Sequence, residues 1–224
     1  MDKYLQPTSI LDFDHPDVKT FVQKTIQGLS DPRQIAVKLF YTVRNSIRYN
    51  PYYVDLTVEG MRASTTLEKG FSWCVGKAVL LSATCRAAGI PAQLGFSDIR
   101  NHQNPEKLTK ILKTDVYFWH GYSLLYLNGR WVKATPAFDL ELCKKHGIIP
   151  VEFDGENDAL FQFYDRHGQP HMEYLNDRGV FDDLPLEQIR ETYRNEYTED
   201  MLKVFLSGDT SLEKEATQTE KKKN

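Results

Sequence analysis

Residues 73–88 form an almost unbroken apolar run, and this run constrains the fold more than any other part of the sequence. Only four polar residues interrupt it: Lys77, Ser82, Thr84 and Arg86. Gly89 follows, then Ile90 and Pro91, which is a common way for a helix to end. A helix that is apolar on every side must be buried on most sides. The sequence therefore predicts a central helix covered by other elements.

The surrounding sequence predicts the elements that cover this helix. Residues 14–30 have apolar positions at helical spacing, and a second helix is expected from Pro32 to about residue 50. A short strand is expected at 92–96, and Asn128-Gly129 between β-rich runs at 116–127 and 130–135 predicts a hairpin. Residues 51–70 and most of 140–205 are expected to be irregular, with a final helix at 185–206.

Composition excludes several classes of protein. The chain has 224 residues and 41% hydrophobic residues, which suffices for one core without a metal or disulfide to stabilise it. A net charge of -3 provides no basic field for nucleic acid, and no apolar run reaches the length of a membrane span. No secretory signal is visible and there are three cysteines, so reduced thiols and a cytoplasmic location are expected. We expect one domain at 1–206, with its core at about 30–140, and a disordered tail at 207–224; the oligomeric state stays open.

Cys74 lies where the apolar helix is expected to begin. Ser72 is a plausible N-cap, which places Cys74 in the first helical turn. Free backbone N–H groups and the helix dipole favour a thiolate there, and the same N–H groups can stabilise an oxyanion. The alternative is a buried structural cysteine, which is how we interpret Cys85, deep in the same apolar run.

His120 on the first strand of the hairpin is the candidate base for Cys74. Counting back from the turn, His120 faces Ala137, and Thr135 and Asp139 are its diagonal neighbours on the same face. A carboxylate at Asp139 can orient the imidazole, although Pro136 disturbs the count because it cannot donate to the ladder. A histidine satisfied within a sheet is the alternative interpretation of His120.

Several sequence blocks together resemble the transglutaminase-like superfamily. They are GFSWCVGKA (70–78) with RAAGIPA (86–92), WHGY (119–122) and NGRWV (128–132), supported by IRY (47–49). The resemblance covers roughly residues 30–140, and its best match is to small members of bacterial type. It implies an α+β fold of papain-like arrangement, in which the helix that carries the nucleophile packs on an antiparallel sheet.

The resemblance also implies a reaction and a catalytic set of Cys74, His120 and Asp139. The Cys74 thiolate attacks an amide carbonyl in a peptide or small amide, His120 protonates the leaving amine, and an acyl-thioester forms. Water resolves the thioester in a hydrolase and a primary amine resolves it in a transglutaminase, and no cofactor or metal is implied. The chain departs from the family at Thr135, which stands where the family usually places its aspartate, while Asp139 lies four residues later.

Two rival interpretations remain open. The first is a non-catalytic member of the same fold that serves as a binding module, and the displaced acid is the best reason for it. The second is a zinc site, because four residues have suitable ligand types and spacing: Cys143, His146, His167 and His171.

Overall fold

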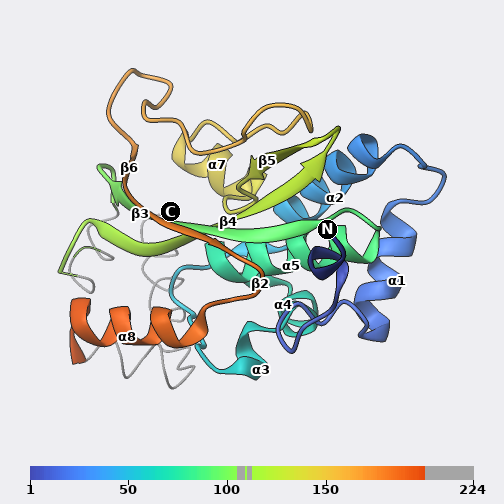
Figure 1. The fold of residues 1–224 in the computed structure, drawn as a ribbon. Helices are drawn as coiled ribbons and strands as arrows, with labels where there is room; N and C mark the ends of the chain where they lie inside the picture. Colours follow the sequence, from blue (N-terminus) through green and yellow to red (C-terminus); the bar gives the residue numbers. More distant parts are fainter. Residues whose placement is uncertain (105–108, 110–112, 200–224) are drawn as a thin grey trace.

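A four-stranded antiparallel sheet and the buried helix α5 (Cys74–Ala87) form the centre of the computed structural model, which describes residues 1–104, 109 and 113–199 (Figure 1). The strand order is β5-β4-β3-β6, and α5 lies against β4 (Val116–Leu127) and β3 (Ala92–Asn101). Buried apolar side chains from Ile10 to Tyr197 belong to one cluster. The fold is α+β, with helices packed on an antiparallel sheet, as predicted.

Helix α5 is buried from Cys74 to Arg86, which confirms the prediction from its apolar sequence. Its internal polar residues are each hydrogen-bonded, because an unpaired buried polar group is costly. Lys77 donates to the carbonyls of Arg44 and Ile47 at 2.8 and 2.5 Å, where α2 ends. Arg86 donates through Nε to the carbonyl of Ala92 at 3.0 Å. The polar side chains of α5 therefore connect this helix to the end of α2 and to Ala92, where β3 begins.

Two N-terminal helices pack beside α5, as expected. Helix α1 spans Pro16–Thr25 and follows the short 3-10 helix η1 (Asp2–Leu5); helix α2 spans Pro32–Ser46. Both begin with proline in the first turn, where the missing N–H is not needed. The Asp31 side chain caps α2 by accepting the N–H of Gln34 at 2.8 Å.

The segment between α2 and α5 is more regular than the sequence predicts. It contains α3 (Val58–Met61) and α4 (Ala63–Lys69). Strands β1 (Arg48–Tyr49) and β2 (Phe71–Ser72) pair in parallel, with Tyr49 opposite Ser72. This short pair joins the end of α2 to the start of α5.

The predicted hairpin is present in its predicted register. Leu127 of β4 pairs with Arg130 of β5 (Arg130–Ala134). Asn128 and Gly129 have φ of 50° and 83°, and a two-residue hairpin turn with two positive φ values favours this dipeptide. The ladder ends where Ser123 pairs with Ala134, so the counted pairing of His120 with Ala137 does not form.

The C-terminal third contains elements that the sequence did not reveal. Helix α7 (Leu140–His146) and the edge strand β6 (Met172–Phe181) lie where irregular structure was expected. The last described helix, α8, spans Leu186–Glu196 and is shorter than predicted. The predicted residues 200–206 of that helix and the predicted tail at 207–224 lie outside the described residues, and the domain boundary at 206 stays a prediction.

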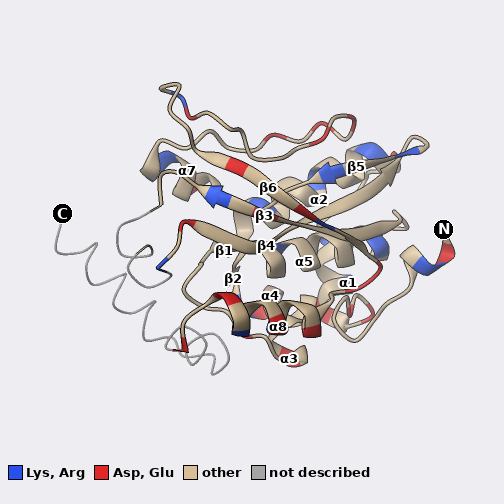
Figure 2. Ribbon diagram, turned by 60° about the vertical axis from the view of Figure 1, so that its left-hand side comes forward, with Lys and Arg blue, Asp and Glu red and all other residues tan. Residues whose placement is uncertain are grey.

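Lysine and arginine are interspersed with acidic residues over the ribbon (Figure 2). Within the described part of the chain, no helix has both the length and the apolar character that crossing a membrane requires.

Candidate active site

Cys74, His120 and Asp139 all line one cavity of about 570 Å³. The cavity lies between the N-terminus of α5, strand β4, the end of β1 and helix α7. Aromatic side chains contribute to its wall, as do charged ones; the aromatic residues are Tyr49, Tyr52, Tyr117, Phe138 and Phe161. An apolar wall with a few polar groups is the usual composition of a small-molecule or peptide site.

Cys74 is the first residue of α5 and is 8% exposed. Trp73, and not Ser72 as expected, occupies the N-cap position, and it makes no side-chain cap hydrogen bond. The first backbone N–H groups of α5 therefore receive no side-chain cap from Trp73. The N–H groups of Cys74 and Val75 interact with the Cys74 thiol instead.

Burial decides the protonation state of the Cys74 thiol. It raises the pKa of the thiol to about 11, although the backbone N–H groups of Gly121 and Val75 act in the opposite direction. The sequence favoured a thiolate at this helix N-terminus, and the structure corrects this, because desolvation of the charged form outweighs the N–H donors. Cys74 is a neutral thiol at neutral pH.

Close packing of β4 on α5 brings His120 beside the Cys74 turn. A Cβ on Gly121 would lie 3.0 Å from the Cα of Val75 and 3.2 Å from its Cγ2. Only a residue without a side chain allows this approach. His120 and Cys74 are the sequence neighbours of Gly121 and Val75, and both line the cavity.

His120 is buried among aromatic rings. It is 2% exposed, and its ring centroid lies 4.9 Å from that of Phe161 and 6.1 Å from that of Tyr174. Its Nε2 is buried without a hydrogen-bond partner among the described residues. Burial lowers the pKa of the imidazole to about 3, so His120 is neutral at neutral pH and is a weaker base than an exposed histidine.

A β-bulge precedes His120 and sets its direction. Ser97 of β3 pairs with His120, whereas Ile99 pairs with Tyr117, so three steps on β4 match two on β3. Trp119 takes up the extra residue at φ 61°, a left-handed conformation that costs a non-glycine residue about 1–2 kcal/mol. Bulges of this kind re-aim a side chain and are common next to active sites.

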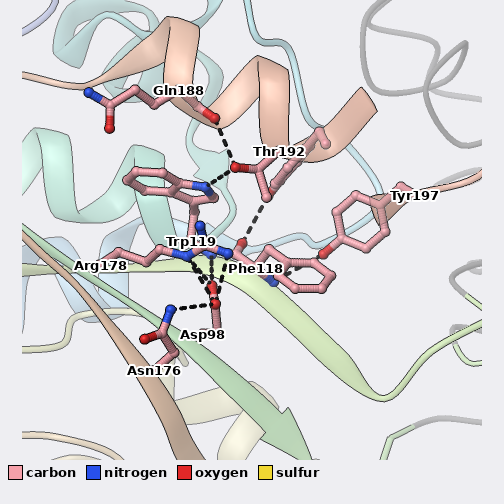
Figure 3. Close-up of polar contacts among 9 residues, drawn as sticks. Asp98, Phe118, Trp119, Asn176, Arg178, Gln188, Thr192 and Tyr197 are labelled. Carbon is pink, nitrogen blue, oxygen red and sulfur yellow. Dashed lines mark hydrogen bonds and ion pairs between the residues drawn. The ribbon is translucent and has the colours of Figure 1, made fainter. Parts of the chain in front are cut away.

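A polar network holds the bulge in place (Figure 3). The Asp98 carboxylate accepts the backbone N–H of Trp119 at 3.1 Å and two hydrogen bonds from Nε of Arg178 at 2.9 Å. The indole N–H of Trp119 donates to Oγ1 of Thr192 on α8 at 2.9 Å, and the Phe118 N–H donates to the Tyr197 hydroxyl at 3.1 Å. Strand β6 and helix α8 therefore support the segment that carries His120.

A family model for the transglutaminase-like superfamily matches residues 19–136, more than half of the chain. The chain belongs to this superfamily. The matched range contains Cys74 and His120, and it ends before Asp139.

Three solved structures resemble this transglutaminase-like chain at low identity. They are a candidate cysteine protease from Cytophaga hutchinsonii (18% identity, TM-score 0.46), a candidate protease from Parabacteroides distasonis (15%, 0.39) and the periplasmic domain of TgpA from Pseudomonas aeruginosa (16%, 0.42). The matches cover 59%, 60% and 59% of this chain, and 40%, 25% and 45% of those chains, respectively. The chain thus spans less than half the length of each. A search of curated protein sequences finds no match.

Asp139 is placed differently from the expectation for a transglutaminase-like acid. Its Oδ1 accepts the Leu142 N–H at 2.9 Å as the N-cap of α7, and its Oδ2 accepts the Tyr49 N–H at 2.8 Å. No hydrogen bond between Asp139 and His120 occurs among the described residues. That Asp139 supports His120 through the cavity stays a prediction. Thr135, at the family position, is fully buried, and its side chain interacts with that of Tyr174.

The zinc alternative finds no support in the described ranges of the transglutaminase-like chain. His146 and His171 line the cavity, whereas Cys143 faces the core at 1% exposure and His167 lies in an exposed turn. Within those ranges, no three His, Cys, Asp or Glu side chains are grouped closely enough to hold a metal ion.

Three residues of the site escaped the sequence analysis. Asp98 and Arg178 support the bulge, and Asn50 lines the cavity. A positive φ at a tryptophan has no sequence signature, so the bulge and its supports are visible only in the structure.

Proposed function

We propose that this chain is a cysteine-dependent acyl-transfer enzyme that acts on amides, with Cys74 as nucleophile and His120 as base. One observation carries the proposal: a thiol at a helix N-terminus and a neutral imidazole line the same cavity, on elements that touch at Val75 and Gly121. A nucleophile next to a base in a largely apolar cavity supports acyl transfer as the reaction class.

The neutral pair supports a general-base route. The sulfur of Cys74 attacks the amide carbonyl carbon while His120 accepts the thiol proton, and the new C–S bond forms as the carbonyl π bond opens. On collapse, the C–N bond breaks and the leaving amine takes the proton from His120. The acyl-thioester is then resolved by water or by a primary amine. Asp139 completes the proposed catalytic set as the group that supports His120.

Acylation of the thiol tests this proposal directly. The chain is incubated with p-nitrophenyl acetate as acyl donor, and intact-mass and peptide mass spectrometry locate the acetyl group. We expect one acetyl thioester at Cys74, no such product in Cys74→Ala, and an unchanged rate in Cys85→Ala. Cys85 is the matched control because it is a cysteine of the same helix at 0% exposure. Adding an alkyl primary amine distinguishes the acceptors, since an amine-accepting enzyme forms the acetamide faster than the free acid and faster than Cys74→Ala does under the same conditions.

A non-catalytic binding module is the second candidate function. The absence of an acceptor for Nε2 of His120 among the described residues favours it, because a catalytic imidazole usually has an orienting partner. His120→Ala separates the two functions. In the enzyme, loss of the base lowers acylation of Cys74 by about 100-fold or more. An acylation rate that does not change in His120→Ala would leave the binding module as the better description.

A further inference from the structure

Asn50 lies directly beside the first turn of the nucleophile helix. It follows β1, and its backbone N–H donates to the carbonyl of Ser72 at 2.9 Å, which continues the parallel pairing of Tyr49 with Ser72. This pairing sets Asn50 alongside Trp73, the N-cap of α5, with Cys74 next in the chain. Asn50 and Cys74 line the same cavity.

The orientation of the Asn50 amide is determined by a local turn. Its Oδ1 accepts the backbone N–H of Tyr52 at 3.0 Å. Because only the oxygen of the amide can accept, the Nδ2 group must be at the other end of the side chain. Asn50 is 5% exposed, and its Nδ2 is buried with no hydrogen-bond partner in the part of the chain that the structure describes.

A buried amide donor without an acceptor destabilises a fold, so its presence calls for an explanation. Asn50 lines the cavity beside Cys74, so an acceptor that enters the cavity and reaches Nδ2 would satisfy this group. In acyl transfer, the carbonyl oxygen of the substrate is such an acceptor. Its capacity to accept grows as negative charge develops on it.

We propose that Nδ2 of Asn50 donates a hydrogen bond to the carbonyl oxygen of the acyl group under attack at Cys74. The inference rests on the proposed function. As the C–S bond forms, the carbonyl π electrons move to oxygen, and Asn50 stabilises the resulting oxyanion. When the intermediate collapses, the C=O bond re-forms and the leaving group departs, so Asn50 neither gains nor loses a proton.

The decisive comparison is between two reactions of the same thiol. Attack on p-nitrophenyl acetate develops an oxyanion, whereas alkylation by iodoacetamide is a displacement at saturated carbon and develops none. The variant is Asn50→Ser, since a serine oxygen still accepts the Tyr52 N–H in the same kind of turn. Asn101→Ser is the matched control for a general effect on the cavity, because Asn101 lines the same cavity and its Oδ1 also accepts an N–H two residues on, that of Gln103 at 3.0 Å. Unlike Asn50, Asn101 is only partly buried, and its Nδ2 is not among the buried groups without a partner.

We expect Asn50→Ser to lower the acetylation rate of Cys74 by about 100-fold and to change its alkylation rate by less than about threefold. The loss of acetylation in Asn50→Ser should be larger than the loss in Asn101→Ser. Equal losses in both reactions, or no loss in either, overturn the role of Asn50. No acetylation of Cys74 in the unchanged chain, while iodoacetamide still alkylates it, refutes the proposed function and with it the inference.

A second measurement needs no variant. The side-chain amide protons of Asn50 are followed by NMR while a peptide aldehyde forms a hemithioacetal with Cys74. A downfield shift of the Nδ2 protons supports the hydrogen bond, and an unchanged position overturns it.

Discussion

Asp98→Ala is the substitution that best tests how the fold positions His120. The Asp98 side chain is 7% exposed and pairs with Arg178, whose Nη2 lies 2.8 Å from Oδ2. The same carboxylate accepts the backbone N–H of Trp119 at 3.1 Å. The substitution therefore removes the acceptor for an N–H in the left-handed bulge and the partner of a largely buried guanidinium.

The expected loss of stability is about 3 kcal/mol. Leaving the Trp119 N–H buried without an acceptor costs about 1–3 kcal/mol. Removing one partner of a buried ion pair costs about 3–5 kcal/mol in total. The lower end applies here, because the Arg178 side chain is 25% exposed and reaches water.

Urea unfolding followed by tryptophan fluorescence measures this loss, and the acetylation rate of Cys74 measures its effect on the site. Asp177→Ala is the matched control. Asp177 is an exposed aspartate on β6, opposite Ser97 of β3. Within the described part of the chain, its carboxylate accepts one hydrogen bond, from the N–H of Gly179. We expect Asp98→Ala to be destabilised far more than this control and to acetylate more slowly. A loss below about 1 kcal/mol, equal to that of the control, would refute the reasoning that Asp98 holds the bulge.

Three further predictions concern the same contact and its surroundings. Gly121→Ala should lower stability by about 1–3 kcal/mol in urea unfolding, because the added Cβ meets the backbone of Val75; an unchanged midpoint contradicts the close packing. Burial lowers the pKa of Lys77 to about 7, below its value in the unfolded chain, so the unfolded state binds more protons above pH 7 and stability rises with pH. The stability of the unchanged chain relative to Lys77→Met should therefore rise by about 1.5 kcal/mol from pH 7 to 8.5, and a flat difference would show that Lys77 stays charged. Asp139→Asn should slow the acetylation of Cys74 more than Thr135→Ala does. The reverse order would show that Thr135, and not Asp139, supports His120.

Local sequence was sufficient wherever one segment determines its own structure. The apolar run at 73–88 predicts a helix buried on most sides, and α5 is buried from Cys74 to Arg86. Asn128-Gly129 predicts both the hairpin and its register, because few dipeptides adopt two positive φ values readily. The joint pattern around Cys74 and His120 was specific enough to indicate the superfamily, which the match over residues 19–136 confirms.

Distant parts of the chain decided the rest of the site. The hairpin count assumed a regular ladder, but the bulge at Trp119 pairs His120 with Ser97, and its supports Asp98 and Arg178 lie 80 residues apart. Edge strand β6, which supplies Arg178, has little local signal, since its pairing with β3 is what stabilises it.

The sequence by itself predicted which residues carry the chemistry, and it determined the helix on which Cys74 lies and the strand on which His120 lies. The tertiary structure alone decided their charge state and their partners. Burial sets the pKa of Cys74 to about 11 and that of His120 to about 3, and it leaves Nδ2 of Asn50 without an acceptor among the described residues. Desolvation depends on every element packed around a group, so no local pattern of residues encodes it.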